Sequence, residues 1–223
     1  MNTKTKLTLV AALILGAVSL NAAQESSFLG SASTKYTSDY ARRGALVSTE
    51  AVQGSVGFSA ETSGVDVYGS LFTSQSTDSG VDSNEFTIGV GTDLFKDVLN
   101  ASIGLYNTDF SSSDNTLEYF VKLQLNTALS PTVSFFDDTD EDLQTFEGSL
   151  SYVVENDLAD LSVSGLVGST DTLATEDQTY TGLTLGLSKD VSEELGIFAD
   201  VSFSDAESRD YETVWGIGLN LNF

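Results

Sequence analysis

The sequence predicts an all-β fold, a transmembrane antiparallel up-and-down β-barrel of about 12 strands. Three observations predict it. Apolar and polar residues alternate with a period of two along most of the chain, which is the pattern of strands with two different faces. No internal stretch approaches the roughly 20 apolar residues that a membrane helix needs. The polar connections at one end of the expected strands are mostly longer than those at the other end, as in outer-membrane barrels.

The N-terminus has the pattern of a targeting segment. Two lysines precede an apolar run from Leu7 to Leu20, and the small residues Ala22 and Ala23 follow it. This order is typical of a secretory signal peptide, whereas a transmembrane anchor requires a longer apolar run. We expect residues 1–23 to be a cleaved signal peptide and residues 24–223 to form the barrel, so that the protein leaves the cytoplasm.

The C-terminal strand shows the alternation most clearly. Trp215, Ile217, Leu219, Leu221 and Phe223 alternate with glycines and asparagines, so a strand places every large apolar group on one face. The same pattern predicts eleven strands before it, in chain order near 28–36, 52–60, 65–71, 86–90, 99–105, 117–125, 133–135, 146–154, 161–167, 183–187 and 195–203.

The seventh of these strands, near 133–135, is the weakest because Phe136 breaks its alternation. Without it the count falls to ten strands. The connections expected to be long are the segments near 38–50, 74–84, 109–115, 137–142, 170–178 and 204–211, which are rich in Ser, Thr, Asp and Gly.

A secreted soluble β-sandwich is the alternative fold, because it also alternates and also follows a signal peptide. The face opposite the apolar one is dense in serine and threonine, which suits either a wetted lumen or a solvent face. Trp215 and Phe223 favour the barrel. Eight strand steps of about 3.3 Å, tilted by about 40°, separate them by roughly 20 Å, close to the spacing of two aromatic girdles.

Two segments resemble known bacterial sequences. The terminal Trp-Gly-Ile-Gly-Leu-Asn-Leu-Asn-Phe resembles the C-terminal strand by which outer-membrane barrels are recognised for assembly, with Trp215 and Phe223 as its aromatic residues. Residues 38–44, Ser-Asp-Tyr-Ala-Arg-Arg-Gly, with the following 52–55, resemble the opening of the uncharacterised proteobacterial Gcw_chp family, from which 45–47 depart. These resemblances imply an outer-membrane barrel of unassigned role.

The composition excludes several classes of function. The chain has 33 acidic and 9 basic residues, a net charge of −24, and neither Cys nor His. The absence of Cys and His removes thiolate and imidazole metal sites, cysteine nucleophiles and Ser-His catalysis. The acidic excess disfavours nucleic acid as a partner. We expect no enzymatic activity and no cofactor.

Nine charged residues share the parity of the predicted inner face. We expect them to point into the lumen, because a charge on the lipid face would cost about 2–4 kcal/mol at mid-depth. The acidic ones outnumber the basic ones, which predicts a lumen that prefers cations. The alternative is that they pair and fill the interior. The candidates are Lys35, Asp66, Glu85, Asp93, Glu118, Lys122, Glu147, Asp200 and Glu212.

Arg42 and Arg43 lie in the first long connection. They have two candidate roles, contact with lipid phosphates at the rim or ion pairing with lumen acids at a constriction. The acidic run 137–142 is a weak candidate for a divalent cation, but it lacks the spacing and the glycine of an EF-hand loop. Its carboxylates include Asp137, Asp138, Asp140 and Asp142.

The predicted function is a small outer-membrane porin-like channel for passive diffusion of small hydrophilic solutes or ions, with a preference for cations. The alternative is a closed barrel whose acidic loops bind divalent cations or an envelope partner. The expected partners are outer-membrane lipid, lipopolysaccharide, the barrel assembly machinery and the small solutes or cations themselves.

Overall fold

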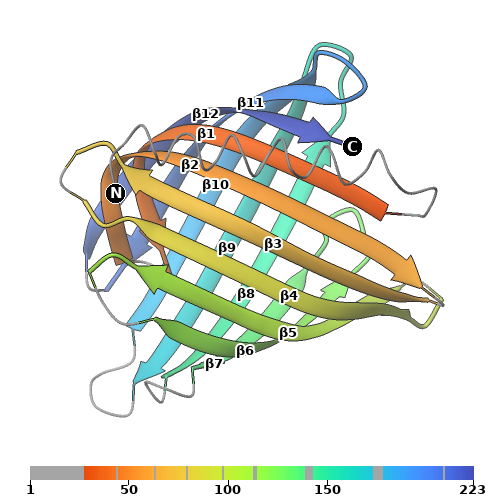
Figure 1. Cartoon of the computed structure of the whole chain (residues 1–223), viewed down its shortest axis with the longest axis horizontal. Coiled ribbons are helices and arrows are strands. Elements are labelled where there is room, and N and C mark those ends of the chain that lie inside the picture. The colour runs from red at the N-terminus through yellow and green to blue at the C-terminus, as the bar shows by residue number, and fades with distance from the viewer. Residues whose placement is uncertain are drawn as a thin grey trace.

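The computed structural model is a single closed barrel of antiparallel strands (Figure 1). It describes residues 28–223 apart from 44, 63, 79, 97, 113–114, 139–142, 173–177 and 208, so the predicted signal peptide lies outside the described residues. No helix in this described part is long and apolar enough to cross a membrane. The strands are β1 (Phe28–Arg42), β2 (Ala45–Thr62), β3 (Val65–Ser76), β4 (Ser83–Leu94), β5 (Leu99–Phe110), β6 (Thr116–Leu125), β7 (Thr132–Asp138), β8 (Leu143–Val154), β9 (Asp160–Thr172), β10 (Gln178–Asp190), β11 (Leu195–Ala206) and β12 (Arg209–Asn222).

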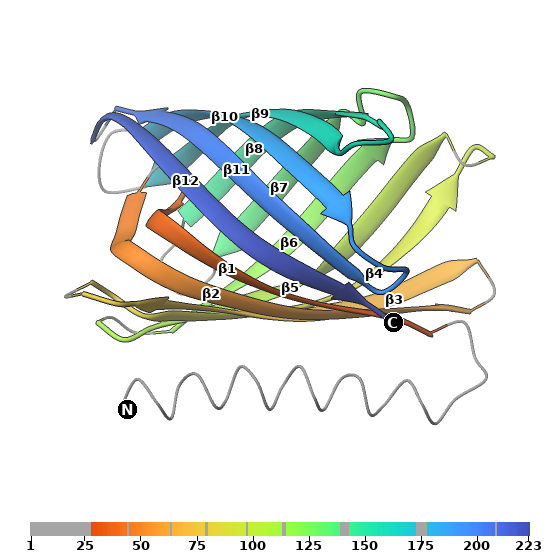
Figure 2. The same ribbon diagram turned by 90° about the horizontal axis from the view of Figure 1, so that it is seen from above.

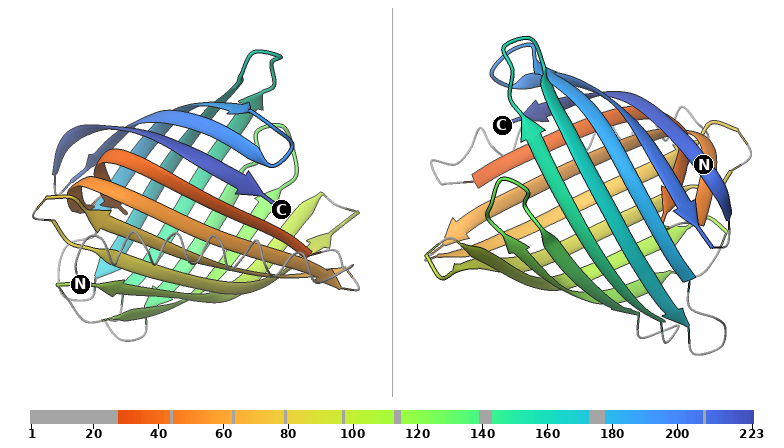
Figure 3. Two further views of the ribbon diagram at one scale, coloured as in Figure 1. Left: turned by 45° about the horizontal axis from the view of Figure 1, so that its top comes forward. Right: turned by 180° about the vertical axis from the view of Figure 1, so that it is seen from behind.

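The strand order is that of an up-and-down meander closed on itself. Each strand pairs with the next along the chain, and β1 pairs with β12 from Ser31 opposite Asn222 to Thr37 opposite Gly216. Figure 3 shows the closed wall from two further sides. The prediction of twelve strands is confirmed, and the ten-strand alternative is wrong because β7 pairs with both of its neighbours.

The two faces of the wall divide as the alternation predicts. Large apolar side chains such as Ile103, Val133, Leu187 and Ile217 stand on the outer face, and each is more than half exposed. A soluble sandwich would bury these side chains in a core, whereas a membrane barrel turns them toward lipid. Residues of the opposite parity, mostly Ser, Thr, Gly and charged side chains, face the lumen.

The connections are shorter than the sequence predicts. In the segments near 38–50 and 204–211 most residues continue the strands, so β1 and β2 have 15 and 18 residues and only residues 43 and 44 lie between them. Backbone ladder bonds do not depend on apolar side chains, so a serine- or threonine-rich strand continues to pair beyond the apolar band. The segment near 38–50 is therefore a β-hairpin instead of a long loop.

This hairpin end leaves the barrel wall. β1 pairs with β12 only as far as Thr37, and β2 pairs with β3 only from Ala51. Residues 38–43 and 45–50, here named the β1–β2 arm, pair mainly with each other. The backbone is irregular at three places, a register shift between Tyr40 and Ala41 and left-handed φ values of 47° at Arg43 and 46° at Glu50. Figure 2 shows the ends of β1 and β2 turning away from the wall.

Candidate functional site

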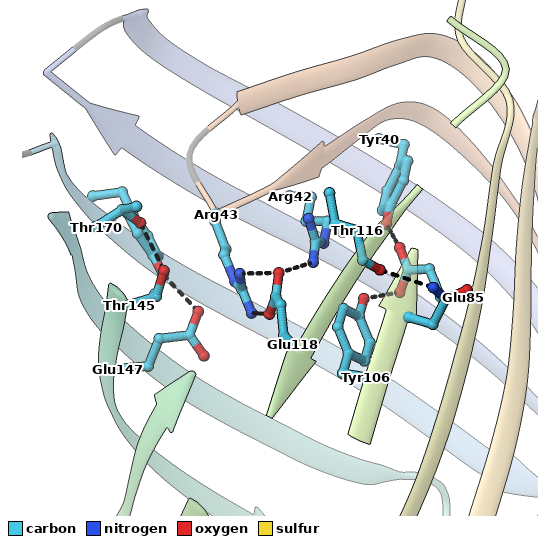
Figure 4. A network of polar contacts seen from close by, with 12 residues as sticks. Tyr40, Arg42, Arg43, Glu85, Tyr106, Thr116, Glu118, Thr145, Glu147 and Thr170 are labelled. Carbon is cyan, nitrogen blue, oxygen red and sulfur yellow. Dashed lines mark hydrogen bonds and ion pairs between the residues drawn. The ribbon is translucent and has the colours of Figure 1, made fainter. Parts of the chain in front are cut away.

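The tip of the β1–β2 arm makes an ion pair with a glutamate of the lumen wall. Arg43 donates from Nη1 to Glu118 Oε1 at 2.8 Å and from Nη2 to Oε2 at 2.5 Å, and Arg42 Nη2 donates to Oε1 at 3.1 Å (Figure 4). A guanidinium that binds both carboxylate oxygens fixes direction as well as distance. The side chain of Glu118 is only 3 % exposed. Of the two roles left open for these arginines, the structure shows the one inside the lumen.

Aromatic rings also contact the two arginines. The guanidinium of Arg43 lies 4.3 Å from the ring centre of Phe136, and that of Arg42 lies 5.0 Å from the ring centre of Tyr106. Phe120 packs beside Phe136 with ring centres 6.2 Å apart. A cation over an aromatic face is attracted by the ring quadrupole, more so where water is excluded. Phe136, which interrupts the alternation of β7, thus has a defined partner.

Two further lumen carboxylates are held by tyrosine hydroxyls. Tyr40 of the arm and Tyr106 of β5 both donate to Glu85 (Figure 4). Tyr180 Oη donates to Glu147 Oε1 at 2.6 Å. A hydroxyl donor satisfies a carboxylate oxygen without adding a positive charge. These hydrogen bonds therefore orient the two carboxylates and leave their negative charge in the lumen.

The arm fills one side of the lumen. Ser74, Ser83 and Thr108 lie on the inner face of β3–β5, where an open lumen would hydrate them, yet all three are fully buried. Glu118 and Thr145 on β6 and β8 are almost as buried. We name the inner face of β4–β7, with Glu85, Tyr106, Glu118, Phe120 and Phe136, the anchoring wall.

The opposite side of the lumen keeps a cavity of about 360 Å³. Tyr40 and Arg43 bound it on the side of the arm. Its other side is the inner face of β9–β12, here named the open wall, which contributes the small hydroxyl side chains Ser164, Thr184, Ser202 and Ser204. Thr184 and Ser202 lie opposite each other with their hydroxyl oxygens 2.8 Å apart.

One ion pair crosses the seam next to the open wall. Lys35 of β1 donates from Nζ to Asp200 Oδ1 of β11 at 2.7 Å, passing over β12. It passes over Gly216, where an added Cβ would lie 2.0 Å from Lys35 Cε. A glycine at this position lets the lysine stem lie flat against the wall.

The remaining predicted lumen residues lie on the inner face but away from the arm and its ion pair with Glu118. Asp66 faces the lumen opposite Gly91, and Asp93 lies at the end of β4, where Asn100 Nδ2 donates to it at 3.0 Å. Lys122 lies between Ser102 and Ser134 and is exposed. Glu212 is opposite Ser204, half-buried.

The first two residues of the acidic run 137–142 point to opposite faces of β7. Asp137 lies on the outer face, where Gln144 Nε2 donates to its Oδ1 at 3.2 Å, and Asp138 is buried on the inner face opposite Glu118. Neighbouring residues of a strand point to opposite faces, so these two cannot share an ion. Asp140 and Asp142 lie outside the described residues. In the described part of the chain no group of three acidic side chains is arranged to hold a metal.

The two aromatic residues of the C-terminal strand take different positions. Trp215 is half-exposed on the outer face beside Tyr36, with ring centres 5.7 Å apart. Phe223 covers Gly30 of β1, and the two residues exchange backbone hydrogen bonds of 2.7 and 2.9 Å. The last residue therefore contributes to the seam that closes the barrel.

Solved structures match the chain over nearly the whole barrel. The KdgM porin superposes with a TM-score of 0.58 over 86 % of this chain and 99 % of its own, at 14 % identity. The NanC porin reaches 0.55 over 86 % and 98 %, at 13 % identity. The translocator domain of the autotransporter NalP from Neisseria meningitidis reaches 0.54 over 98 % of both chains, at 15 % identity. The chain has the fold of these bacterial outer-membrane barrels.

Sequence comparisons add no family. No family model matches the chain, and no curated protein matches it either. The resemblance of residues 38–44 to the Gcw_chp proteins therefore has no support beyond those residues. At identities of 12–15 % the structural likeness concerns the fold alone.

Sequence reasoning missed the tyrosines Tyr40 and Tyr180 and the carboxylate Asp138 as members of the lumen. Asp138 has the parity of Ser134 and Phe136, so continuing the alternation of β7 by two residues would have placed it. Tyr180 similarly continues the inner parity of Thr184. Tyr40 has the parity of Tyr36, which is on the outer face, and reaches the lumen only because the arm turns inward.

Proposed function

We propose that this protein is a small porin-like channel of the bacterial outer membrane for passive diffusion of small hydrophilic solutes or ions. The cavity between the β1–β2 arm and the open wall carries this proposal. It has a volume of about 360 Å³ inside a closed barrel, and small hydroxyl side chains contribute to its lining together with Phe72, Leu166 and Tyr180. Hydroxyls can replace water around a passing polar solute without binding it tightly. The fold shared with the KdgM and NanC porins supports the same function.

We further propose that the channel prefers cations. The inner face carries more carboxylates than basic groups, and a charged pore raises the local concentration of the opposite charge. Glu85 and Glu147 contribute because tyrosine hydroxyls hold them without neutralising them. The carboxylates are Asp66, Glu85, Asp93, Glu118, Asp138, Glu147, Asp200 and Glu212, and the basic groups are Lys35, Arg42, Arg43 and Lys122.

One structure of KdgM is described as a complex with disordered oligogalacturonate. That ligand is a polyanion. The carboxylates of this lumen would repel such a ligand.

The proposal includes the surroundings of the barrel. Residues 1–23 act as a cleaved signal peptide, and the apolar outer face contacts outer-membrane lipid and lipopolysaccharide. The strand from Trp215 to Phe223 is the segment that the barrel assembly machinery binds. The protein acts without catalysis or a cofactor, since it has no His or Cys to support the common mechanisms of barrel enzymes.

A closed barrel that binds an envelope partner or divalent cations is the second candidate. The burial of Ser74, Ser83 and Thr108 beneath the arm favours it, because the arm closes that part of the lumen. Electrical recording separates the two candidates.

The test is single-channel recording of the purified protein in a planar lipid bilayer. We expect discrete conductance steps, and in a salt gradient a reversal potential of the sign given by cation flow. The double variant E85Q/E147Q removes two hydroxyl-held charges and should reduce the cation preference without closing the channel. A protein that shows no steps above the bilayer background would overturn the channel in favour of the closed barrel, and an anion-selective reversal potential would overturn the preference alone.

A further inference from the structure

The β1–β2 arm is not held in the barrel wall by ladders to both neighbouring strands, unlike the rest of β1 and β2. Beyond Thr37 and Ala51 it has lost the ladders to β12 and β3 that hold the rest of β1 and β2. Among the described residues, its backbone-to-backbone bonds outside the hairpin are to the β3–β4 connection, from Thr77 N to Glu50 O at 2.7 Å and from Val81 N to Val47 O at 3.4 Å. Its position across the lumen therefore depends on side chains.

The side-chain contacts of the arm toward the anchoring wall are led by ion pairs and hydrogen bonds, and aromatic rings lie beside them. Tyr40 packs on Phe72 with ring centres 5.6 Å apart, and at the base of the arm Trp215 N donates to Ser38 Oγ at 3.1 Å. Arg42 and Arg43 bind one carboxylate, Glu118, and Tyr40 donates to Glu85. When the ion pair opens into the lumen, the guanidiniums and the carboxylate regain water, so the apolar surface that release uncovers is limited to a few rings such as Phe136 and Phe72.

The wall beneath the arm is also suited to exposure. Among the described residues, the hydroxyls of Ser74, Ser83 and Thr108 are buried and have no hydrogen-bond partner in the protein. A buried hydroxyl without a partner costs free energy that water would return. The arm can bend where its backbone is irregular, at the register shift between Tyr40 and Ala41 and at Glu50.

We infer that the β1–β2 arm is a movable plug, latched against the anchoring wall by Glu118, which widens the passage when it swings away. This inference rests on the proposed channel function and names its regulation. Glu118 is the latch because it accepts from both arginines. Release frees two positive charges from the wall and adds the space beneath the arm to the cavity beside the open wall.

The test compares two carboxylate-to-amide variants at the same end of the barrel. E118Q removes the charge that both arginines bind, whereas D137N removes a charge from the outer face of β7. We expect E118Q to show a larger conductance step than the wild type, and D137N to match the wild type. Equal steps in E118Q and the wild type would overturn the latch, whereas the absence of steps in all three would instead overturn the channel.

A labelling experiment tests the movement without any conductance. The chain has no cysteine, so T108C introduces a single thiol on the wall beneath the arm. A membrane-impermeant thiol reagent should label T108C slowly, and about tenfold faster when E118Q releases the arm. The double variant R42Q/R43Q removes the arginine side of the same ion pair and should speed the labelling of T108C by a similar factor. It replaces E118Q if that variant fails to fold. Unchanged labelling in folded barrels of both would show that the arm is fixed.

Discussion

The two walls of the lumen differ in the side chains that they present to the arm and to the cavity. The anchoring wall places glutamates and aromatic rings next to the arm. Arg43 contacts Glu118 and Phe136, and Phe120 packs beside Phe136. The open wall presents the hydroxyls of Thr184 and Ser202 to the cavity, together with the larger Leu166 and Tyr180. Both walls are built from strands of the same alternation, so the difference lies only in the inward residues.

This difference shows how a small barrel can be narrowed on one side. Eight strands are nearly filled by their own side chains and sixteen leave a wide channel, so twelve leave room for one inserted hairpin beside a passage. Bulky and charged residues fix the hairpin to one wall. Small hydroxyls on the other wall preserve the space that the hairpin does not take.

Filling the open wall should have the largest effect on transport. T184W places an indole in the cavity, and we expect the single-channel conductance to fall by about tenfold, because little free cross-section remains in a barrel of this size. L185W is the matched control, since the neighbouring residue points to lipid and should keep the wild-type conductance. If both variants conducted alike, the passage would not follow the open wall.

Glycine substitutions should separate the two walls by stability. A Cβ at Gly104, on the anchoring wall, would lie 2.2 Å from Ile88 O and 2.6 Å from Phe120 Cζ, whereas a Cβ at Gly182, on the open wall, has its nearest neighbour at 3.8 Å. We expect G104A to lower the free energy of unfolding by about 1–3 kcal/mol. G182A should change it by less than about 0.5 kcal/mol. Urea unfolding in lipid vesicles measures both, and equal losses would contradict the packing contrast.

The smallest effect concerns Lys35, the long side chain beside the open wall. G216A should displace it and break its ion pair with Asp200, at a cost of about 1 kcal/mol because both groups are partly exposed. The same substitution in a K35M background should cost less, since there is no ion pair left to lose. A cost that is equal in the two backgrounds would assign the effect to the backbone of β12 alone.

Much of this arrangement follows from local pattern. The alternation predicts all twelve strands and the inward parity of the nine charged lumen candidates, from Lys35 to Glu212, because the pleat ties each side chain to one face. Phe136 looked like a fault in β7 and is instead an inward ring, because the neighbouring Phe135 continues the outer face.

The partners of these residues could not be predicted. Arg43 and Glu118 are far apart in the sequence and meet only after the barrel closes and the arm turns inward. Parity no longer assigns a face once a strand leaves the wall, which is why Tyr40 reaches Glu85 from an outward position. The polar composition of 38–50 indicated a loop, although its backbone pairs as a hairpin.

The contact between Gly30 and Phe223 has a consequence for the order of assembly. Every other seam joins strands that are consecutive along the chain, so those seams can form as each hairpin arrives. The seam of β1 with β12 joins opposite ends of the chain and carries the largest loop-closure cost. Until β12 pairs with β1, the sheet is open and has two edge strands with unpaired backbone groups, which can mispair with other chains. Phe223 therefore helps to join the two edge strands and close the open sheet into a barrel.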